Sequence, residues 1–320
     1  MAAILTRTQK FIIANGREIP VIRRVHWVRW LGGAVAAVCF ALFIVSLATN
    51  ENIRWNRVLD YLFDGKILDG LVVTIWVSIL ATVLGLVLGV VLAVMKLSHN
   101  PVFNWLSTIY IWFFRSTPVL VQLIFWYNLA FLFPRIILQI PFTGIGVFWD
   151  TNEVMTGFNA ALLGLGLNLA AYFAETVRAG IQAVDRGQTE AAAATGMTSF
   201  QQTRIIVLPQ ALRIIIPPTA NEFISMLKTT SLIYVVAGND LMTNASQIYK
   251  QNNLIMELLI VASIWYMVLT AVATFLQTKL EQRFGVDAVR VVRGASWTQR
   301  AMGAMRANSV ISPERKAAQR

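Results

Sequence analysis

The chain has 320 residues, of which 57% are hydrophobic and 13% are charged, and its mean hydropathy is +0.61. Soluble domains carry about 25% charged residues, so this composition excludes an ordinary soluble domain and indicates an integral membrane protein. The net charge of +11 does not require a nucleic-acid partner, because basic loops beside membrane spans and their attraction to anionic lipid account for it.

The chain begins with a basic arm, residues 1–30, which holds six of the 27 lysines and arginines. Thirty residues before the first apolar run are too many for the n-region of a signal peptide, so we expect this run to be retained as a span. The single cysteine, Cys39, lies within the run and has no partner for an internal disulfide. Its predicted role is packing.

Apolar runs suited to crossing about 30 Å of hydrocarbon recur along the chain, and all but the fifth, which contains Glu222 and Lys228, are uncharged. Backbone groups in lipid must be satisfied internally, and the alternation typical of a barrel strand is absent, so we expect helices. The sequence predicts six transmembrane helices, the third and fourth of them short. They cover residues 31–48, 71–95, 118–133, 158–173, 214–236 and 258–276.

Two segments between the predicted spans carry patterns of their own. Residues 103–114 are rich in aromatic side chains and too short to cross before Arg115, which predicts an interfacial segment leading into the third span. Residues 134–153 contain prolines, glycines and acids and are predicted to be an extracellular loop. This loop either meets an external partner or is a passive connector.

Basic residues are unevenly divided between the two sides of the predicted bundle. Twenty-one of the 27 fall on the side of the N-terminal arm, the loop 178–213 and the polar, basic tail 283–320. The opposite loops hold only Arg54, Arg57, Lys66, Arg135 and Lys250. Because loops rich in Lys and Arg stay in the cytosol, both termini and the loop around Glu190 are predicted to be cytosolic.

Residues 190–209 resemble a soluble segment inside a chain otherwise suited to lipid. Thr189 or Gln188 is predicted to open a short helix through the alanine run 191–194, and Gly196 to end it. A second helix, capped by Thr198 or Ser199, is predicted to run to a break at the next proline, residue 209. Two short helices between membrane spans form a rigid projection suited to docking another protein.

Polar residues recur at helical spacing on one face of the fifth predicted span. An ionisable group exposed to lipid at mid-membrane costs at least about 2.5–3.5 kcal/mol, so this face is predicted to look into the bundle or into a wet pathway. A polar packing seam, including a Glu222–Lys228 pair, is the open alternative. The prolines at 217–218 either bend this helix near its cytosolic end or begin it.

Two further pairs of residues suggest contacts within the bundle. Glu175 and Arg178, three apart on one predicted helix, are expected to form an ion pair near the cytosolic boundary rather than to contact substrate. Gly85 and Gly89 form a G-x-x-x-G motif in an apolar helix, which permits close helix contact. In a chain with several spans this motif predicts internal packing.

Several chemistries lack the residues that they need. No phosphate-binding loop of the form G-x-x-x-x-G-K-[ST] occurs, so the chain has no usual cradle for ATP. Two histidines, His26 and His99, and one cysteine do not provide a His/Cys metal cluster. We therefore predict no catalytic residue and no metal site, and expect energy for any transport to come from elsewhere.

The frame EAA-x3-G-x9-I-x-LP, beginning at Glu190, resembles the EAA loop of ATP-binding-cassette (ABC) importer permeases. Residues 114–122, 171–181 and 217–232 are similar to the polar-amino-acid branch of these permeases, the histidine, glutamine and glutamate type. The similarity covers residues 67–282, so the first span, 31–48, is an addition to a five-span core. Ser116 and Thr229 stand where that branch often has Gly and Asp, which leaves the substrate open.

The resemblance implies an all-α membrane fold, a type I importer permease bundle with a cytosolic coupling helix, in a bacterial inner membrane. It implies a transport subunit without enzymatic activity or a cofactor of its own, ATP and Mg²⁺ being bound by separate ATPase subunits. The other implied partners are a second permease subunit, identical or homologous, an extracytoplasmic binding protein and an amino-acid substrate. The predicted ATPase-coupling residues are Arg186, Glu190, Ala191, Ala192, Gly196 and Met197, and the predicted pathway residues are Asn221, Glu222, Ser225, Lys228 and Thr229.

Two other functions stay open from the residues alone. A secondary transporter driven by an ion gradient would explain charges such as Glu222 and Lys228 inside a span, but it leaves the Glu190 loop unexplained. A non-transporting anchor or receptor is favoured only by the basic tail.

Overall fold

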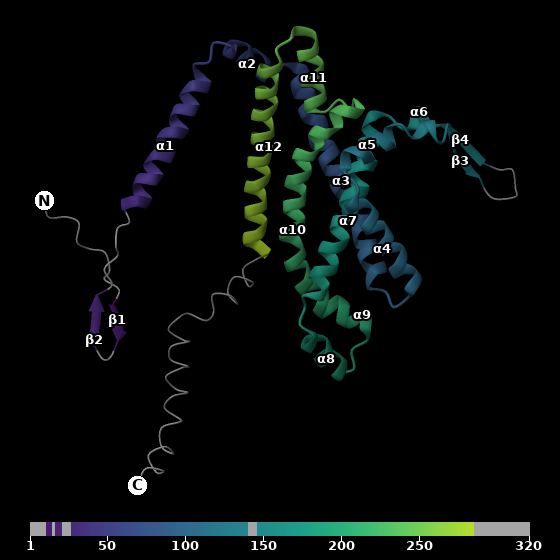
Figure 1. Ribbon diagram of the computed structural model, residues 1–320. Helices are drawn as coiled ribbons and strands as arrows, with labels where there is room; N and C mark the ends of the chain where they lie inside the picture. The colour runs from purple at the N-terminus through teal and green to yellow at the C-terminus, as the bar shows by residue number, and fades with distance from the viewer. Residues whose placement is uncertain (1–10, 15–16, 21–26, 140–145, 285–320) are drawn as a thin grey trace. The chain divides into compact units, whose positions relative to one another are not determined.

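A computed structural model of the chain describes residues 11–14, 17–20, 27–139 and 146–284 (Figure 1). The chain divides into two units, Met1–Arg54 and Trp55–Arg320. Most of the predicted basic arm and almost all of the predicted tail lie outside the described residues, so their expected structure is not assessed.

The first unit contains a short hairpin and one long helix. Strands β1 (Phe11–Ala14) and β2 (Arg17–Pro20) pair in antiparallel fashion, which the sequence did not predict. Helix α1 (Trp27–Ala48) has 22 residues, or about 33 Å of helix, enough to cross a bilayer. Its stretch Trp30–Ala48 meets the length and hydropathy expected of a span, in agreement with the first predicted span.

Three more helices of the described chain are long and apolar enough to cross a membrane. They are α3 (Gly65–Leu97), α7 (Gly157–Gln182) and α12 (Ile255–Phe284), each longer than predicted. Polar caps set the starts of two of them, because the side chain of Asp64 accepts a bond from the Lys66 amide and that of Thr156 accepts one from the Asn159 amide.

The prediction that residues 118–133 form a transmembrane helix of their own is wrong. Helix α5 (Val119–Tyr127) has nine residues, about 13 Å, and is followed by a 3₁₀ turn, η1 (Leu129–Phe131). The preceding aromatic segment belongs to α4 (Pro101–Ser116), and α4 and α5 meet at a bend of 101°. Together they form a broken span or a re-entrant loop, and the chain leaves the helical conformation at Thr117, which precedes a proline.

The fifth predicted span begins earlier and ends earlier than expected. Helix α10 (Leu208–Thr229) continues through Pro217 and Pro218, so these residues neither break nor begin it, and a 3₁₀ helix, η3 (Thr230–Val236), follows. Pro209 is the second residue of α10, and η2 leads into it without a break because Val207 and Leu208 are both helical. The predicted break at Pro209 is therefore wrong.

The remaining elements lie at the two ends of the second unit. Helices α8 (Arg186–Ala194) and α9 (Ser199–Gln201), with the π-helical segment η2 (Gln202–Val207), form one end (Figure 1). Toward the other end are α2 (Trp55–Leu62), α11 (Leu241–Asn252) and α6 (Thr151–Val154). There the predicted loop 134–153 forms a hairpin of β3 (Arg135–Gln139) and β4 (Gly146–Asp150) before α6.

The centre of the second unit is the seam between α3 and α7. Val77, Leu165 and Phe173 are fully buried there and belong to one apolar cluster. A Cβ atom added to Gly89 would lie 2.6 Å from the Phe173 Cβ and 3.0 Å from the Ala170 carbonyl oxygen. The predicted G-x-x-x-G motif is thus an internal packing motif, as expected.

Replacing Gly89 should separate these two helices. We expect Gly89→Val to destabilise the protein by about 1–3 kcal/mol or to prevent its accumulation in the membrane, because both a side chain and the backbone of α7 occupy the space. Gly33→Val is the matched control, since nothing lies within 4 Å of its added Cβ in another apolar helix. Thermal melting of the detergent-purified protein measures both, and equal melting temperatures would contradict this view of the seam.

Candidate functional site

The loop that contains Glu190 is a helix with defined ends. The side chain of Asp185 accepts a bond from the Gly187 amide and caps α8, so the prediction that Thr189 or Gln188 opens this helix is wrong. At its other end the Gly196 amide donates to the Ala193 carbonyl and the Met197 amide to the Ala192 carbonyl. Gly196 has a φ of +81°, so these two bonds form a Schellman motif. The predicted helix stop at Gly196 is confirmed.

A second cap follows immediately. Thr198 and Gln201 exchange bonds in a capping box, in which the Thr198 hydroxyl accepts from the Gln201 amide and the Thr198 amide donates to the Gln201 side chain. This confirms the predicted cap at Thr198. Two apolar side chains remain exposed beside it, Phe200 at 71% and Ile205 at 61%. The sequence analysis missed both, although an aromatic residue in a polar loop is a usable signal.

The predicted coupling residues lie in α8 or directly after it, and their environments differ. Arg186, Glu190, Ala191 and Gly196 are exposed, whereas Ala192 is only 4% exposed, and Met197 is half-buried. Glu190 is the fifth residue of α8 and thus lies beyond the first turn, where a helix dipole acts most strongly. Its exposed carboxylate is therefore available to a partner rather than committed to stabilising the helix end.

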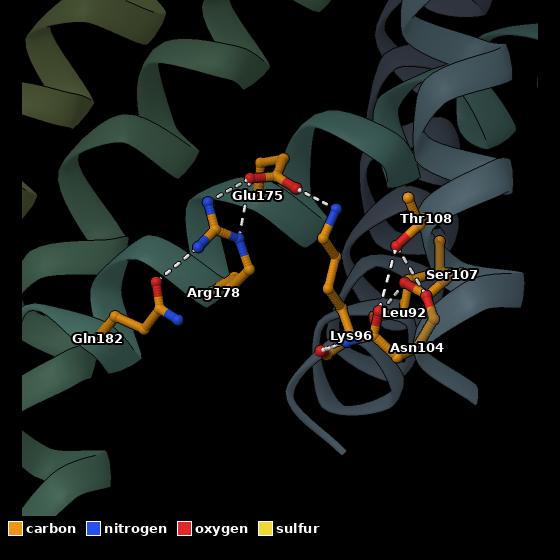
Figure 2. Close-up of polar contacts among 8 residues, drawn as sticks. All are labelled: Leu92, Lys96, Asn104, Ser107, Thr108, Glu175, Arg178 and Gln182. Carbon is orange, nitrogen blue, oxygen red and sulfur yellow. Dashed lines mark hydrogen bonds and ion pairs between the residues drawn. The ribbon is translucent and has the colours of Figure 1, made fainter. Parts of the chain in front are cut away.

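An ion-pair network joins α3 and α7 just before α8 begins (Figure 2). The Glu175 carboxylate lies 3.2 Å from the Lys96 Nζ and 2.6 Å from an Arg178 guanidinium nitrogen, and Arg178 also donates to the Gln182 side chain. The predicted Glu175–Arg178 pair is confirmed, and Lys96 was missed because it lies 79 positions earlier in the chain. All three charged side chains are 21–29% exposed.

The same end of α3 is bonded to α4. The Asn104 side chain donates to the Lys96 carbonyl oxygen at 2.6 Å, and the buried Ser107 hydroxyl donates to the Leu92 carbonyl oxygen at 2.7 Å (Figure 2). Helices α3, α4 and α7 are therefore tied together at the end from which α7 leads into α8.

The predicted pathway residues of α10 have different environments. Glu222 and Thr229 line a cavity of about 410 Å³, while Ser225 and Lys228 are exposed. Asn221 accepts a bond from the Gln277 side chain of α12 at 2.9 Å. Among the described residues no ion pair joins Glu222 to Lys228. The alternative in which these two residues pair within a polar packing seam is therefore not found.

The cavity beside Glu222 gathers polar groups from three helices. Arg115 of α4 and Asn168 and Tyr172 of α7 line it together with Glu222 and Thr229 of α10. The Arg115 guanidinium lies 5.3 Å from the centre of the Tyr172 ring, a cation–π contact. A cation and a carboxylate thus occupy the walls of one cavity, an arrangement suited to a zwitterionic solute.

Hydrogen bonds hold the α4–α5 bend at the wall of this cavity. The buried Gln122 side chain donates to the Phe114 carbonyl and to Thr117, and Asn168 donates to the Phe114 carbonyl and to the Gln122 side-chain oxygen. These bonds satisfy carbonyl groups that the bend leaves without helical partners. Arg115 and Asn168 were not predicted as site residues, because only the fold brings them to α10.

Residues 85–286 match the family described as binding-protein-dependent transport system inner membrane component, which is more than half of the chain. The chain belongs to this family. It is the permease subunit of an ABC amino-acid importer and a membrane protein. The family match, its relatives and its structural neighbour all agree on this.

The permease is 41% identical over 293 residues to an arginine transport system permease protein, ArgU, of Corynebacterium glutamicum, with 90% of this chain and 91% of that protein covered. It is 34% identical to the glutamate/aspartate import permease protein GltK of Escherichia coli O6:H1, with 72% and 97% covered. The part of this chain outside the ArgU match is about a tenth of its 320 residues. That is fewer than the 48 residues up to the end of α1. The match to ArgU therefore extends into that first helix.

Solved structures support the same fold. The permease matches a chain of a crystal structure of an amino acid ABC transporter with histidines at a TM-score of 0.59 and 34% identity, covering 68% of this chain and 94% of that one. A chain of the inward-facing MetNI methionine ABC transporter matches at a TM-score of 0.51 and 18% identity, which bears on the fold alone.

The Lys96–Glu175 contact should contribute measurable stability. We expect a coupling energy on the order of 1 kcal/mol from the variants Glu175→Gln, Lys96→Met and their combination, because the pair is mostly shielded from water. The control cycle, Arg57→Gln with Asp60→Asn, should give almost none, since those side chains are 58% and 61% exposed. Thermal melts of the four variants in each cycle provide the measurement, and equal coupling in the two cycles would contradict the assignment.

Proposed function

We propose that the permease couples ATP hydrolysis on a separate subunit to import of a polar or charged amino acid through the α8 loop. The observation that carries this proposal is the α8 helix itself, which is capped at both ends and follows directly on the bonded group of α3, α4 and α7. A rigid projection fixed to several spans can transmit a push from a partner. A flexible loop could not.

In this proposal the ATPase binds the exposed residues of α8 and α9. Phe200 and Ile205 offer exposed apolar area, and aromatic residues frequently anchor protein interfaces. Glu190 and Arg186 supply exposed charges beside them, and the half-buried Met197 completes the patch. The ATP and Mg²⁺ belong to the ATPase, and this chain needs no cofactor of its own.

The Gly196 turn provides the direct test of coupling. A β-branched residue strongly disfavours the left-handed conformation that Gly196 adopts, so Gly196→Val should reshape α8 without filling any occupied space. We expect membrane insertion to be retained while ATP-driven uptake in proteoliposomes falls at least about tenfold, a loss of roughly 1.4 kcal/mol or more.

Gly187→Ala is the matched control for this variant. Gly187 lies in the same helix at an ordinary φ, and an added Cβ would meet only the Asp185 side chain, at 3.3 Å. Uptake by this control should be close to that of the unaltered protein. Undiminished ATP-driven uptake by Gly196→Val would refute the coupling role, and uptake that requires a proton or sodium gradient instead of ATP would support the secondary-transport alternative.

The cavity lined by Arg115 and Glu222 is our proposed contact point for substrate in the membrane. Every α-amino acid carries a carboxylate and an ammonium group, which Arg115 and Glu222 can each bind with a charge-assisted hydrogen bond. This modifies the prediction for Lys228, which lies on an exposed face of α10 together with Ser225. We propose that a second permease subunit faces Asn221, Ser225 and Lys228 across a shared pathway.

The position of the charges suggests both partners and orientation. The excess of basic residues supports a cytosolic α8 loop and cytosolic termini, and in that orientation the β3–β4 hairpin would lie outside the cell. Its exposed Phe148 and Trp149 then offer an extracytoplasmic binding protein a contact surface. Arginine is the first substrate to test, because it appears in the name of the relative with 41% identity.

Glu222→Gln should lower amino-acid uptake while leaving ATPase binding intact. We expect a fall of roughly tenfold, because one charge-assisted contact contributes about 1.5–3 kcal/mol. Asp60→Asn, which removes an exposed acid on α2, is the control and should leave uptake unchanged. Radiolabelled arginine uptake and co-purification of the ATPase are measured for both variants. Equal uptake by Glu222→Gln and Asp60→Asn would exclude Glu222 from the pathway.

A further inference from the structure

A second cavity lies between α3, α10 and α12, on a different side of α10 from the substrate cavity. It measures about 640 Å³, and its walls are largely aliphatic and aromatic, including Ile216, Phe223, Leu276 and Leu280. None of these residues lines the cavity beside Glu222. Its apolar walls do not suit a charged amino acid, which must keep its polar groups paired.

Two threonine hydroxyls on these walls have no hydrogen-bond partner. The Oγ1 atoms of Thr82 and Thr219 are buried and unbonded, and both residues line this cavity. Elsewhere in the same helices threonine hydroxyls donate to the carbonyl four residues earlier, as Thr229 does in α10 and Thr274 in α12. A buried hydroxyl without a partner costs free energy, so a ligand that brings oxygen acceptors would be stabilised here.

One cation stands at the rim of the cavity. Lys279 lines it and lies near the C-terminal end of α12, with its Nζ 5.5 Å from the centre of the Phe275 ring. The α10 residues of the cavity lie around the middle of that helix, whereas the C-terminal end of α12 points toward the end of the bundle that carries α8 (Figure 1). The charged rim is therefore toward the end of the bundle that carries α8 (Figure 1).

We propose that this cavity binds one anionic phospholipid from the leaflet on the α8 side. An acyl chain fits the apolar walls, ester or phosphate oxygens accept bonds from Thr82 and Thr219, and Lys279 attracts the negatively charged headgroup. A free phosphate ion would leave the apolar walls uncovered. A zwitterionic lipid would gain less from Lys279.

Native mass spectrometry of the full importer tests this assignment. The complex is placed in nanodiscs that contain equal amounts of phosphatidylglycerol and phosphatidylcholine with identical chains, and the lipids retained on release are counted. We expect retention of phosphatidylglycerol in preference to phosphatidylcholine. Lys279→Gln should reduce that preference about fivefold, the effect of one basic residue near a membrane surface, whereas the exposed Lys250→Gln should not.

The threonines provide an independent arm. Thr82→Val with Thr219→Val preserves side-chain shape and removes both hydroxyls, so it should reduce the retained phosphatidylglycerol. In lipid-free detergent the same variant should melt at an equal or higher temperature, because it removes two unpaired buried groups. Equal retention of the two lipids by the unaltered importer would overturn the proposal. Unchanged retention in both the Lys279 and the threonine variants would also overturn it.

Discussion

The close approach of α3 and α7 is the constraint on which the rest of the second unit depends. Gly89 lets the α7 backbone and Phe173 come within distances that any side chain would block, and Gly85 meets Leu169 in the same way one turn earlier. Because α7 continues into α8 after only three residues, the position of the α8 loop follows from this seam. Packing of small residues, rather than a hydrophobic driving force, is what can hold helices together in lipid.

Polar groups then connect this packed pair to the rest of the bundle. Glu175 bonds to Lys96 across the seam, and Asn168 bonds across to the α4–α5 bend. One set of contacts is next to α8 and the other is at the wall of the Glu222 cavity. A displacement of α8 by a partner would therefore act on the same helices that shape the proposed substrate cavity. In the proposed function, this connection would carry the effect of ATP hydrolysis to the pathway.

The sequence predicted most clearly those features that depend on local chemistry. Apolar runs long enough to cross a bilayer located four spans, and the glycine stop and threonine cap near Glu190 were recognisable from residue type alone. The α4–α5 bend was missed although Thr117 before a proline is a local signal for it, and the bonds from Gln122 and Asn168 that hold it form only in the folded bundle. Pro217 and Pro218 were expected to bend or to begin a helix, and their place inside α10 excludes the second alternative. Arg115 was not predicted as a site residue, because only the folded structure brings it to the cavity beside Glu222.

The central claim is that α8 faces the compartment where ATP is hydrolysed, and cysteine labelling in intact cells measures this directly. In a Cys39→Ala background, Asp150→Cys and Thr195→Cys each place one thiol at an exposed position, and the two lie toward opposite ends of the bundle (Figure 1). A membrane-impermeant maleimide should label position 150 in intact cells and position 195 only after permeabilisation. Labelling of position 195 but not 150 in intact cells would contradict the account.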